Sequence, residues 1–364
     1  MKKDKKSIIS PFAVISLILF AIVGVTYKIS CRNSAFADKV NATVCQGFRK
    51  FMASIGNLVS FSLIELLIIL LPVFVGLLVW RAVKVFKSGE GRVRFIINLA
   101  AVALLIYSGH LLALGIAHNT TDIGKKMELK SIKVTAEELA EITEMLVFEI
   151  NELAPTLDRN ERGVFDPGYS YEELSKKILE SYDDLAKIYD LNENFESSAK
   201  GVYFSNAMSY LGITGIYTYP TGEANVNDAY PAYVTIFTAA HEMSHQRGVL
   251  RENEANFMAF LLTVTSSDPN LRYSGYLNIY SYVASALYRT DKEAYYKISS
   301  DLSTLAKTDI RAANEIADKY DDTIIERISD KINDFYLKSS GSSDGVISYS
   351  RVVRLVVDYY NTEK

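Results

Sequence analysis

The stretch that most constrains the fold reads His241-Glu242-Met243-Ser244-His245-Gln246-Arg247-Gly248, and Glu252 follows it closely. The chain has only four histidines, and two of them are spaced four residues apart here. On a helix, residues i and i+4 lie on one face, so both imidazoles can bind the same metal ion. Glu242 lies about 100° further round the helix, where it can contact a water activated by zinc without binding the metal itself. This spacing is the HExxH zinc signature.

The third metal ligand has two competing interpretations. A metzincin would continue with a histidine three residues after Gly248, but that position is Arg251, which does not bind zinc. A gluzincin-like site takes a glutamate from the following helix, where Glu252 and Glu254 are available. We favour Glu252, because Asn256 then follows one turn later on the same face and can orient a histidine or a carboxylate. Glu254 lies about 200° round the helix from Glu252 and is expected to face solvent.

The sequence thus predicts one bound Zn2+ ion, with Glu242 as the general base and three ligands, namely His241, His245 and Glu252. Both cysteines of the chain lie outside the motif, so a zinc site built from cysteine is excluded. The chemistry that this set of residues predicts is hydrolysis of a peptide bond by a zinc-dependent metallopeptidase.

The setting of the motif indicates a soluble domain rather than a membrane span. We expect a helix over residues 233–247 with Gly248 as its C-cap, and a second helix over residues 251–265. The apolar run at 231–240 is too short for a membrane span, and the sequence after it is too polar. This argues against an intramembrane protease. Arg247 departs from the apolar residue that is usual at its position in the motif.

Three long apolar stretches precede this domain, at residues 8–27, 58–80 and 95–117. Each has roughly the twenty residues needed to cross a bilayer, so we predict three transmembrane helices. The membrane anchor is expected to cover residues 1–118 and the soluble domain residues 119–364. Glu65 and His110 lie within the second and third stretches, and we favour a structural role for both. Cleavage of the first stretch as a signal peptide is disfavoured, because its apolar core is too long.

The distribution of basic residues favours an orientation with the N-terminus in the cytoplasm. The domain after residue 118 then lies outside the cytoplasm. Cytoplasmic display of the domain remains the alternative, because the first loop is also basic. In the favoured orientation Cys31 and Cys45 share an oxidising compartment, and the sequence leaves a disulfide and two free thiols equally open.

The region after residue 119 has the amphipathic periods of a mostly helical domain. Residues 135–153 predict a helix with a capping box, and residues 171–189 predict another with a serine cap. Residues 201–220 have the glycine, tyrosine and isoleucine pattern of strands and turns. Further helices are expected at residues 271–288, 292–306, 310–336 and 346–360. The predicted fold class is mostly α, with three transmembrane helices followed by a helical zincin-like α+β domain that has a small β-sheet.

Zincins bind peptides along an edge strand beside the motif helix, and residues 213–219 are the candidate edge. The polar run at 221–227 has two interpretations: either it is a polar turn, or it contacts the substrate through Glu223, Asn225 or Asn227. Stabilisation of the oxyanion is expected from a tyrosine or an arginine, because the other two histidines lie within or at the end of the third apolar stretch. The candidates are Tyr349, Arg351 and Arg354.

The arrangement resembles the domain of unknown function 3810 family of bacterial proteins. The similar stretches are residues 61–67, 221–227, 241–248, 252–257 and 349–353. The resemblance implies a membrane-anchored protein with a zincin-like metallopeptidase domain. We therefore expect a multi-pass protein of the bacterial cell membrane, held in the lipid bilayer, whose substrate is a peptide or protein of the envelope. The net charge of −4 and the pI of about 5.7 give no indication of nucleic-acid binding. The alternative is a non-catalytic envelope scaffold or sensor that retains a zincin fold.

Overall fold

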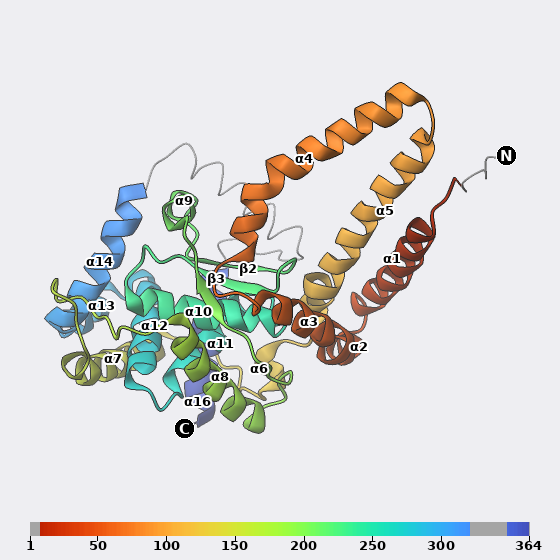
Figure 1. Cartoon of the computed structure of the whole chain (residues 1–364). Coiled ribbons are helices and arrows are strands. Elements are labelled where there is room, and N and C mark those ends of the chain that lie inside the picture. The colour runs from red at the N-terminus through yellow and green to blue at the C-terminus, as the bar shows by residue number, and fades with distance from the viewer. Residues whose placement is uncertain (1–7, 321–347, 364) are drawn as a thin grey trace, which may run out of the picture.

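The computed structural model describes residues 8–320 and 348–363. A bundle of three long helices projects from a larger helical domain (Figure 1). These helices are α1 (Pro11–Ser30), α4 (Leu63–Ser88) and α5 (Arg92–His110). Each is long and apolar enough to cross a membrane. At the end of α5 the chain continues through two short turns, η2 (Leu111–Gly115) and η3 (Ala117–Asn119).

The ends of the bundle helices follow from local sequence. Ser10 caps α1: its hydroxyl accepts a hydrogen bond from the Ala13 amide at 3.1 Å and donates one to Asn98 at 2.5 Å. The turn between α4 and α5 contains Gly89 and Gly91, whose φ angles are 76° and 73°. Only glycine adopts such angles without strain, which allows the chain to reverse within a few residues. This turn lies at the end of the bundle away from the domain (Figure 1).

The segment between α1 and α4 is helical and packs onto the domain, although it falls within the predicted membrane anchor. It forms α2 (Ser34–Val40), the π-turn η1 (Asn41–Cys45) and α3 (Gln46–Gly56). The buried Arg49 guanidinium holds this segment in place, donating to the Ala113 carbonyl at 3.2 Å and to the Asn41 side chain at 2.8 Å. Cys31 is exposed, Cys45 is buried, and both are free thiols in this structure.

The helices of the domain surround one large core. The predicted capping boxes are present at the starts of α7 (Ala136–Leu153) and α8 (Tyr171–Ile188). The core lies between α7, α10 (Ala232–Gln246), α11 (Glu252–Val264), α12 (Pro269–Thr290) and α16 (Ser348–Glu363). The remaining helices of the described domain are α6 (Ile123–Lys126), η4 (Ala154–Thr156), α9 (Ser205–Tyr210), α13 (Lys292–Ser300) and α14 (Thr304–Tyr320).

A small three-stranded sheet covers α10. Its strands are β1 (Ala199–Gly201), β2 (Gly215–Thr218) and β3 (Glu223–Val226), in the order β1-β3-β2. β3 pairs in parallel with β1 and antiparallel with β2, so β2 is an edge strand among the described strands. The prediction of a mostly helical protein with a small sheet is therefore confirmed.

Three local predictions differ from the structure. The run at 221–227 is not simply a polar turn, since it contains the central strand β3, and part of the strand-like region at 201–220 forms the helix α9. The helix predicted at 292–306 is interrupted, because α13 ends at Ser300 and a new helix starts at Thr304. At the break, the Ser303 amide donates to the Asn151 side chain at 2.8 Å. The first part of the helix predicted at 310–336 belongs to α14, and residues 321–336 lie outside the described residues.

A second, smaller core joins the bundle to the sheet. It contains Tyr217 of β2, Leu250 and three residues at the end of the third apolar helix, namely Ala113, Leu114 and Ala117. The ring of Tyr219, just after β2, lies 5.8 Å from the ring of His110, edge to face. β2 and the residue Leu250 before α11 thus pack against the turns η2 and η3 that follow α5.

Candidate metal centre

Helix α10 presents the histidines of the motif at one end of the sheet. Its apolar side chains Ile236, Phe237 and Met243 are buried in the domain core. This packing leaves His241 and His245 on the face that turns toward α11, with His245 only 7% exposed. Their rings lie edge to face, with centroids 4.6 Å apart. The helix therefore aligns both imidazoles as the spacing of four predicts.

A sharp turn brings the start of α11 beside this face. Gly248, with a φ of +87°, follows the end of α10, and its amide donates to the His245 carbonyl at 3.0 Å. A Cβ atom at this position would also lie only 2.4 Å from the guanidinium of Arg49. Glycine is required here both for its backbone angle and for the close approach of α3. Glu252, the first residue of α11, then faces the two histidines.

The three candidate ligands converge on one point. Glu252 Oε2 lies 3.3 Å from His241 Nε2, and Glu252 Oε1 lies 3.7 Å from His245 Nε2. One ligand atom from each residue can be chosen so that all three lie within 4.8 Å of one another. Ligand atoms bound at 2.0–2.1 Å to a tetrahedral zinc ion lie about 3.4 Å apart. The two distances from Glu252 lie near this value, so the three residues could hold a metal ion.

The other ring nitrogen of each histidine has its own partner. His241 Nδ1 lies 3.0 Å from Asn256 Oδ1, and His245 Nδ1 lies 2.7 Å from the Val249 carbonyl oxygen. Both partners are acceptors, so each Nδ1 donates its proton to its partner and each Nε2 faces the cluster. Asn256 thus occupies the position that its spacing from Glu252 predicts.

The charges of the cluster favour an ionised glutamate beside a neutral histidine. Burial alone would raise the pKa of Glu252, but the hydrogen bond from His241 and the positive potential of His245 and His241 lower it to about 2. Burial lowers the pKa of His245 to about 4. For His241, burial is outweighed by the contact with Glu252, and the pKa is raised. A carboxylate and a neutral imidazole are the protonation states that bind metals.

Glu242 is buried beside the cluster without belonging to it. It is 4% exposed, and burial raises its pKa to about 8. Its Oε2 atom has no hydrogen-bond partner among the described residues. Such an atom in a protein interior normally pairs with a polar group or an ordered water. The carboxylate is therefore placed to contact a molecule bound at the cluster.

The edge strand β2 lies directly against Glu242. A Cβ atom on Gly215 would be 2.4 Å from Thr238 Cγ2 and 2.8 Å from Glu242 Oε1. The absence of a side chain at Gly215 is therefore what allows β2 to approach α10 so closely. The strand that begins at Gly215 falls within the range predicted for the edge, residues 213–219.

Comparison with known proteins places the chain in a family. The model of the family described as "Protein of unknown function (DUF3810)" matches residues 41–357. The chain belongs to the DUF3810 family. No curated protein and no solved structure shows significant similarity to it. The matched region contains the candidate metal cluster, the sheet, α4 and α5, whereas α1 lies before it.

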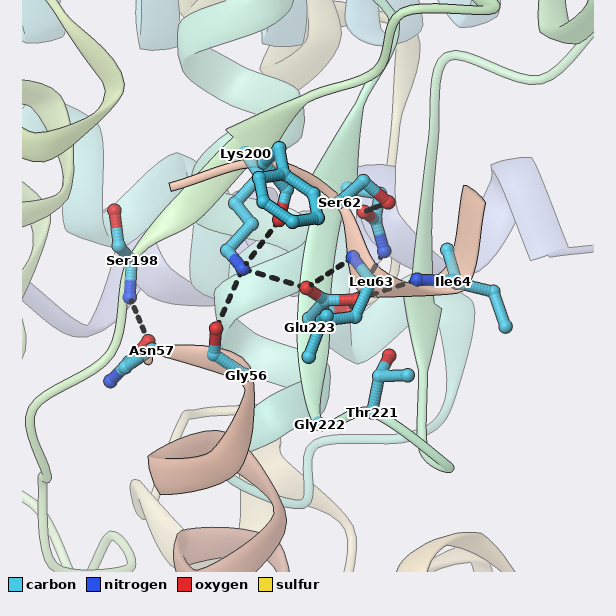
Figure 2. Close-up of polar contacts among 12 residues, drawn as sticks. Gly56, Asn57, Ser62, Leu63, Ile64, Ser198, Lys200, Thr221, Gly222 and Glu223 are labelled. Carbon is cyan, nitrogen blue, oxygen red and sulfur yellow. Dashed lines mark hydrogen bonds and ion pairs between the residues drawn. The ribbon is translucent and has the colours of Figure 1, made fainter. Parts of the chain in front are cut away.

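The polar residues proposed as substrate contacts are buried in the sheet of this DUF3810 member. Glu223 is 1% exposed and pairs with Lys200 at 2.7 Å. Asn225 accepts a hydrogen bond from the Ser62 hydroxyl at 2.7 Å, and Asn227 donates to the Ile213 carbonyl at 2.8 Å. All three side chains therefore make contacts within the fold. Figure 2 shows Glu223 at the junction of β3 with the start of α4.

Two further polar residues near the motif, Glu254 and Arg247, are buried in the structure. Glu254 does not face solvent as predicted; it is 4% exposed, pairs with Arg251 at 2.6 Å and accepts from the Ile123 amide at 3.2 Å. Arg247, unusual for the motif, is 1% exposed. Its guanidinium donates to the carbonyls of Met243 and Phe195, both at 2.8 Å. It anchors α10 to the segment before β1.

The candidate oxyanion residues all lie on α16. The side chain of Tyr349 is outside the described part of the structure, and Arg351 is exposed. Arg354 is also exposed; it donates to Ser131 Oγ and lies 3.7 Å from Asp358 Oδ2. Neither of these partners belongs to the cluster.

His118 was set aside in the sequence because it lies at the end of the third apolar stretch. In the structure it lies near the cluster, close enough to interact electrostatically with Glu252 and His245. Arg251 fixes this turn, because its guanidinium donates to the His118 carbonyl at 3.0 Å. The scarcity of histidine in the chain was the signal that could have identified His118.

Proposed function

We propose that this protein is a membrane-anchored zinc metallopeptidase of the gluzincin-like kind. In this proposal α1, α4 and α5 span the bacterial cell membrane, with the N-terminus in the cytoplasm and the domain outside. The observation that carries the proposal is the cluster of His241, His245 and Glu252 beside Glu242, whose Oε2 atom has no hydrogen-bond partner among the described residues. The composition of the cluster, two imidazoles and one carboxylate, is the ligand set of catalytic zinc sites in peptidases.

The four residues of the site have separate roles in the proposed reaction. His241, His245 and Glu252 would hold the zinc ion, which supplies Lewis-acid activation of water when it is bound. Glu242 accepts a proton from that water and then donates it to the leaving amine nitrogen of the substrate. The positive charge of a bound zinc ion would favour the ionised form of Glu242, which is the form that accepts a proton.

The substrate is proposed to be a peptide or protein segment of the envelope in an extended conformation. An extended segment can pair with the backbone of the edge strand β2, which also packs on Glu242. Backbone pairing would position a peptide bond next to the cluster regardless of its side chains.

Metal binding tests the first part of the proposal. Purified wild-type protein should contain about one zinc ion per chain, and His245→Ala should lose it. His110→Phe is the matched control, because this histidine lies on α5 outside the cluster, and it should retain zinc. Equal zinc contents in wild type and His245→Ala would contradict the proposed site.

Hydrolysis is tested by Glu242→Gln, which should keep zinc and lose activity because an amide does not accept the proton. The measurement compares the envelope proteomes of cells carrying wild type and Glu242→Gln, in which uncleaved precursors should accumulate in the variant. Glu180→Gln, at an exposed position of α8, is the control and should match wild type. If Glu242→Gln binds zinc and the proteome is unchanged, the scaffold or sensor alternative is favoured.

The orientation has its own test. Cys31 is exposed at the domain end of the bundle, whereas Glu90 lies in the turn between α4 and α5 at the other end. A membrane-impermeant maleimide should label Cys31 in intact cells. A cysteine introduced by Glu90→Cys, in a Cys31→Ser background, should be labelled only after permeabilisation. The reverse pattern would place the domain in the cytoplasm.

A further inference from the structure

Exposed apolar side chains gather around the start of α4, on the domain side. Four of them come from two loops: Leu58 and Phe61 from the link between α3 and α4, and Tyr203 and Phe204 from the link between β1 and α9. Their exposed fractions are 79%, 54%, 89% and 45%, in that order. We call this set the apolar rim. Large apolar side chains this exposed, and close together, normally mark a surface that contacts something other than water.

Both loops of the apolar rim are attached to the first turn of α4. The backbone amides of Tyr203 and Phe204 donate to the two carboxylate oxygens of Glu65, at 3.0 Å and 2.8 Å. This contact gives Glu65 the structural role that the sequence favoured. The Phe61 carbonyl accepts a hydrogen bond from the buried ammonium of Lys200 at 3.0 Å. These contacts fix the position of the apolar rim along the axis of α4, next to its first turn.

A second set of contacts fixes α4 itself to the sheet. The carboxylate of Glu223 accepts hydrogen bonds from the Leu63 and Ile64 amides, at 2.8 Å and 3.1 Å, and caps the helix (Figure 2). A carboxylate at this end also interacts favourably with the helix dipole. α4 and the domain thus hold each other through two exchanged carboxylates: Glu223 binds the start of α4, and Glu65 of α4 binds the loop before α9.

The surface above the apolar rim is the apolar surface of α4. Leu66, Leu67 and Ile68 follow Glu65 directly, with exposed fractions of 38%, 40% and 60%. No residue of α4 is buried within the described structure. An apolar helix surface of this length fits the acyl chains of a bilayer. The apolar rim therefore begins where this apolar surface of α4 ends. In a bilayer that α4 crosses, this position is the depth of the lipid headgroups.

We propose that the apolar rim inserts into the headgroup region of the bilayer that α4 crosses. Tyrosine and phenylalanine suit this depth, because their rings enter the apolar layer while polar groups nearby remain hydrated. Insertion holds the sheet and its edge strand at a set distance from the membrane surface. This proposal depends on α4 spanning the membrane and does not depend on zinc or on peptidase activity.

Tryptophan fluorescence in vesicles tests the depth of the apolar rim. The chain has one tryptophan, Trp80, which Trp80→Phe removes. In that background, Tyr203→Trp reports on the apolar rim, and Phe148→Trp, at a 61% exposed position of α7, is the matched control. The full chain is reconstituted into phosphatidylcholine vesicles whose lipids carry bromine near the headgroup end or near the tail end of the acyl chains.

Emission from residue 203 should be blue-shifted relative to residue 148 and quenched most by bromine near the headgroup end. Emission from residue 148 should be unaffected by either lipid. Phe204→Trp provides a second reporter if Tyr203→Trp impairs folding, and it should give the same pattern. If residues 203 and 204 are no more quenched than residue 148, the proposal is overturned. A blue shift without quenching also overturns it, since it indicates a protein contact in place of lipid.

Quenching of Trp80 in the unmodified chain distinguishes insertion of the apolar rim from membrane crossing by α4. If Trp80 is quenched and residue 203 is not, α4 lies in the bilayer and only the insertion of the apolar rim fails. If Trp80 itself is not quenched, α4 does not cross the bilayer, and both the insertion and the proposed membrane anchoring fail. Either result leaves the zinc measurements on His245→Ala unaffected.

Discussion

Lys200 Nζ lies 2.7 Å from Glu223 Oε1, and the two side chains are only 3% and 1% exposed. The pair joins the outer strand β1 to the central strand β3. The same ammonium also donates to the Gly56 carbonyl at 2.7 Å, at the end of α3 (Figure 2). A buried ion pair repays the cost of desolvation only when additional hydrogen bonds satisfy both groups, as they do here.

Removing one charge of this pair should be worse than removing both. Glu223→Gln leaves the Lys200 ammonium buried without a counter-ion, which costs about 3–5 kcal/mol, and it weakens the cap of α4. The double variant Lys200→Met/Glu223→Gln should unfold at a higher temperature than Glu223→Gln alone. Thermal unfolding in detergent micelles measures this. Equal or lower stability of the double variant would contradict the charge argument.

The approach of β2 to α10 predicts an effect of adding one methyl group. Gly215→Ala should destabilise the protein by about 1–3 kcal/mol, because the new Cβ overlaps Thr238 and Glu242. At about 2–4 °C per kcal/mol, the melting temperature should fall measurably. In the proposed enzyme, hydrolysis should fall as well, because Glu242 is displaced.

Two further variants test whether the destabilisation by Gly215→Ala comes from the overlap with Thr238. Thr238→Ser removes the methyl group that the new Cβ meets, so it should restore part of the lost stability when combined with Gly215→Ala. Gly47→Ala is the control, since its Cβ would meet no atom within 4 Å. A melting temperature of Gly215→Ala equal to that of Gly47→Ala would show that the close approach is relaxed in solution.

Asn256 is expected to orient a metal ligand. Asn256→Ala should weaken zinc binding about 10–100-fold, because His241 loses the acceptor that holds its ring and its tautomer. Asn256→Asp keeps an acceptor at the same place and should bind zinc at least as tightly as wild type. Competition with a chromogenic chelator gives both affinities. An unchanged affinity in Asn256→Ala would remove Asn256 from the site.

Asp268 provides a prediction about pH. Its carboxylate accepts hydrogen bonds from Lys177 and Tyr169, both at 2.7 Å, and caps α12. Burial raises the pKa of Asp268, but these bonds outweigh it and hold the pKa below the usual 3.8. A group whose pKa is lower in the folded state stabilises the protein above its unfolded pKa. That contribution is lost as the pH falls through the folded value.

Asp268→Asn should therefore lower the melting temperature near neutral pH, by about 2–4 °C for a loss of about 1 kcal/mol. The difference from wild type should shrink below about pH 3.8, where the wild-type carboxyl also becomes protonated. Asp184→Asn, whose carboxylate is 75% exposed, is the control and should have little effect at any pH. A difference for Asp268→Asn that stays constant with pH would assign the loss to packing rather than to charge.

The parts of the fold that depend on local sequence were predicted well. The capping boxes of α7 and α8, the end of α10 at Gly248 and the spacing of His241 and His245 all depend on residues within one or two turns. The three apolar helices also follow from long uninterrupted runs of apolar residues. Short-range patterns of this kind do not need knowledge of what packs against them.

The errors come from contacts between distant residues. β3 was missed because Glu223 and Asn225 look like turn residues. Their burial depends on partners that lie far away in the sequence, among them Lys200 and Ser62. Glu254 was expected in solvent, since neither the Ile123 amide nor the packing against it is visible in the α11 sequence. Polar residues can be buried wherever a partner satisfies them, and one sequence does not reveal such partners.

The turn at Gly248 has a consequence for how the protein matures. It places all candidate metal ligands within one continuous segment, from His241 to Glu252, on two neighbouring helices. Closing so short a loop costs little conformational entropy compared with contacts between distant segments. If the protein binds zinc as proposed, the ion would meet all its ligands once this helical hairpin has formed. Loading with metal would then be a local event of folding that does not require the C-terminal helix.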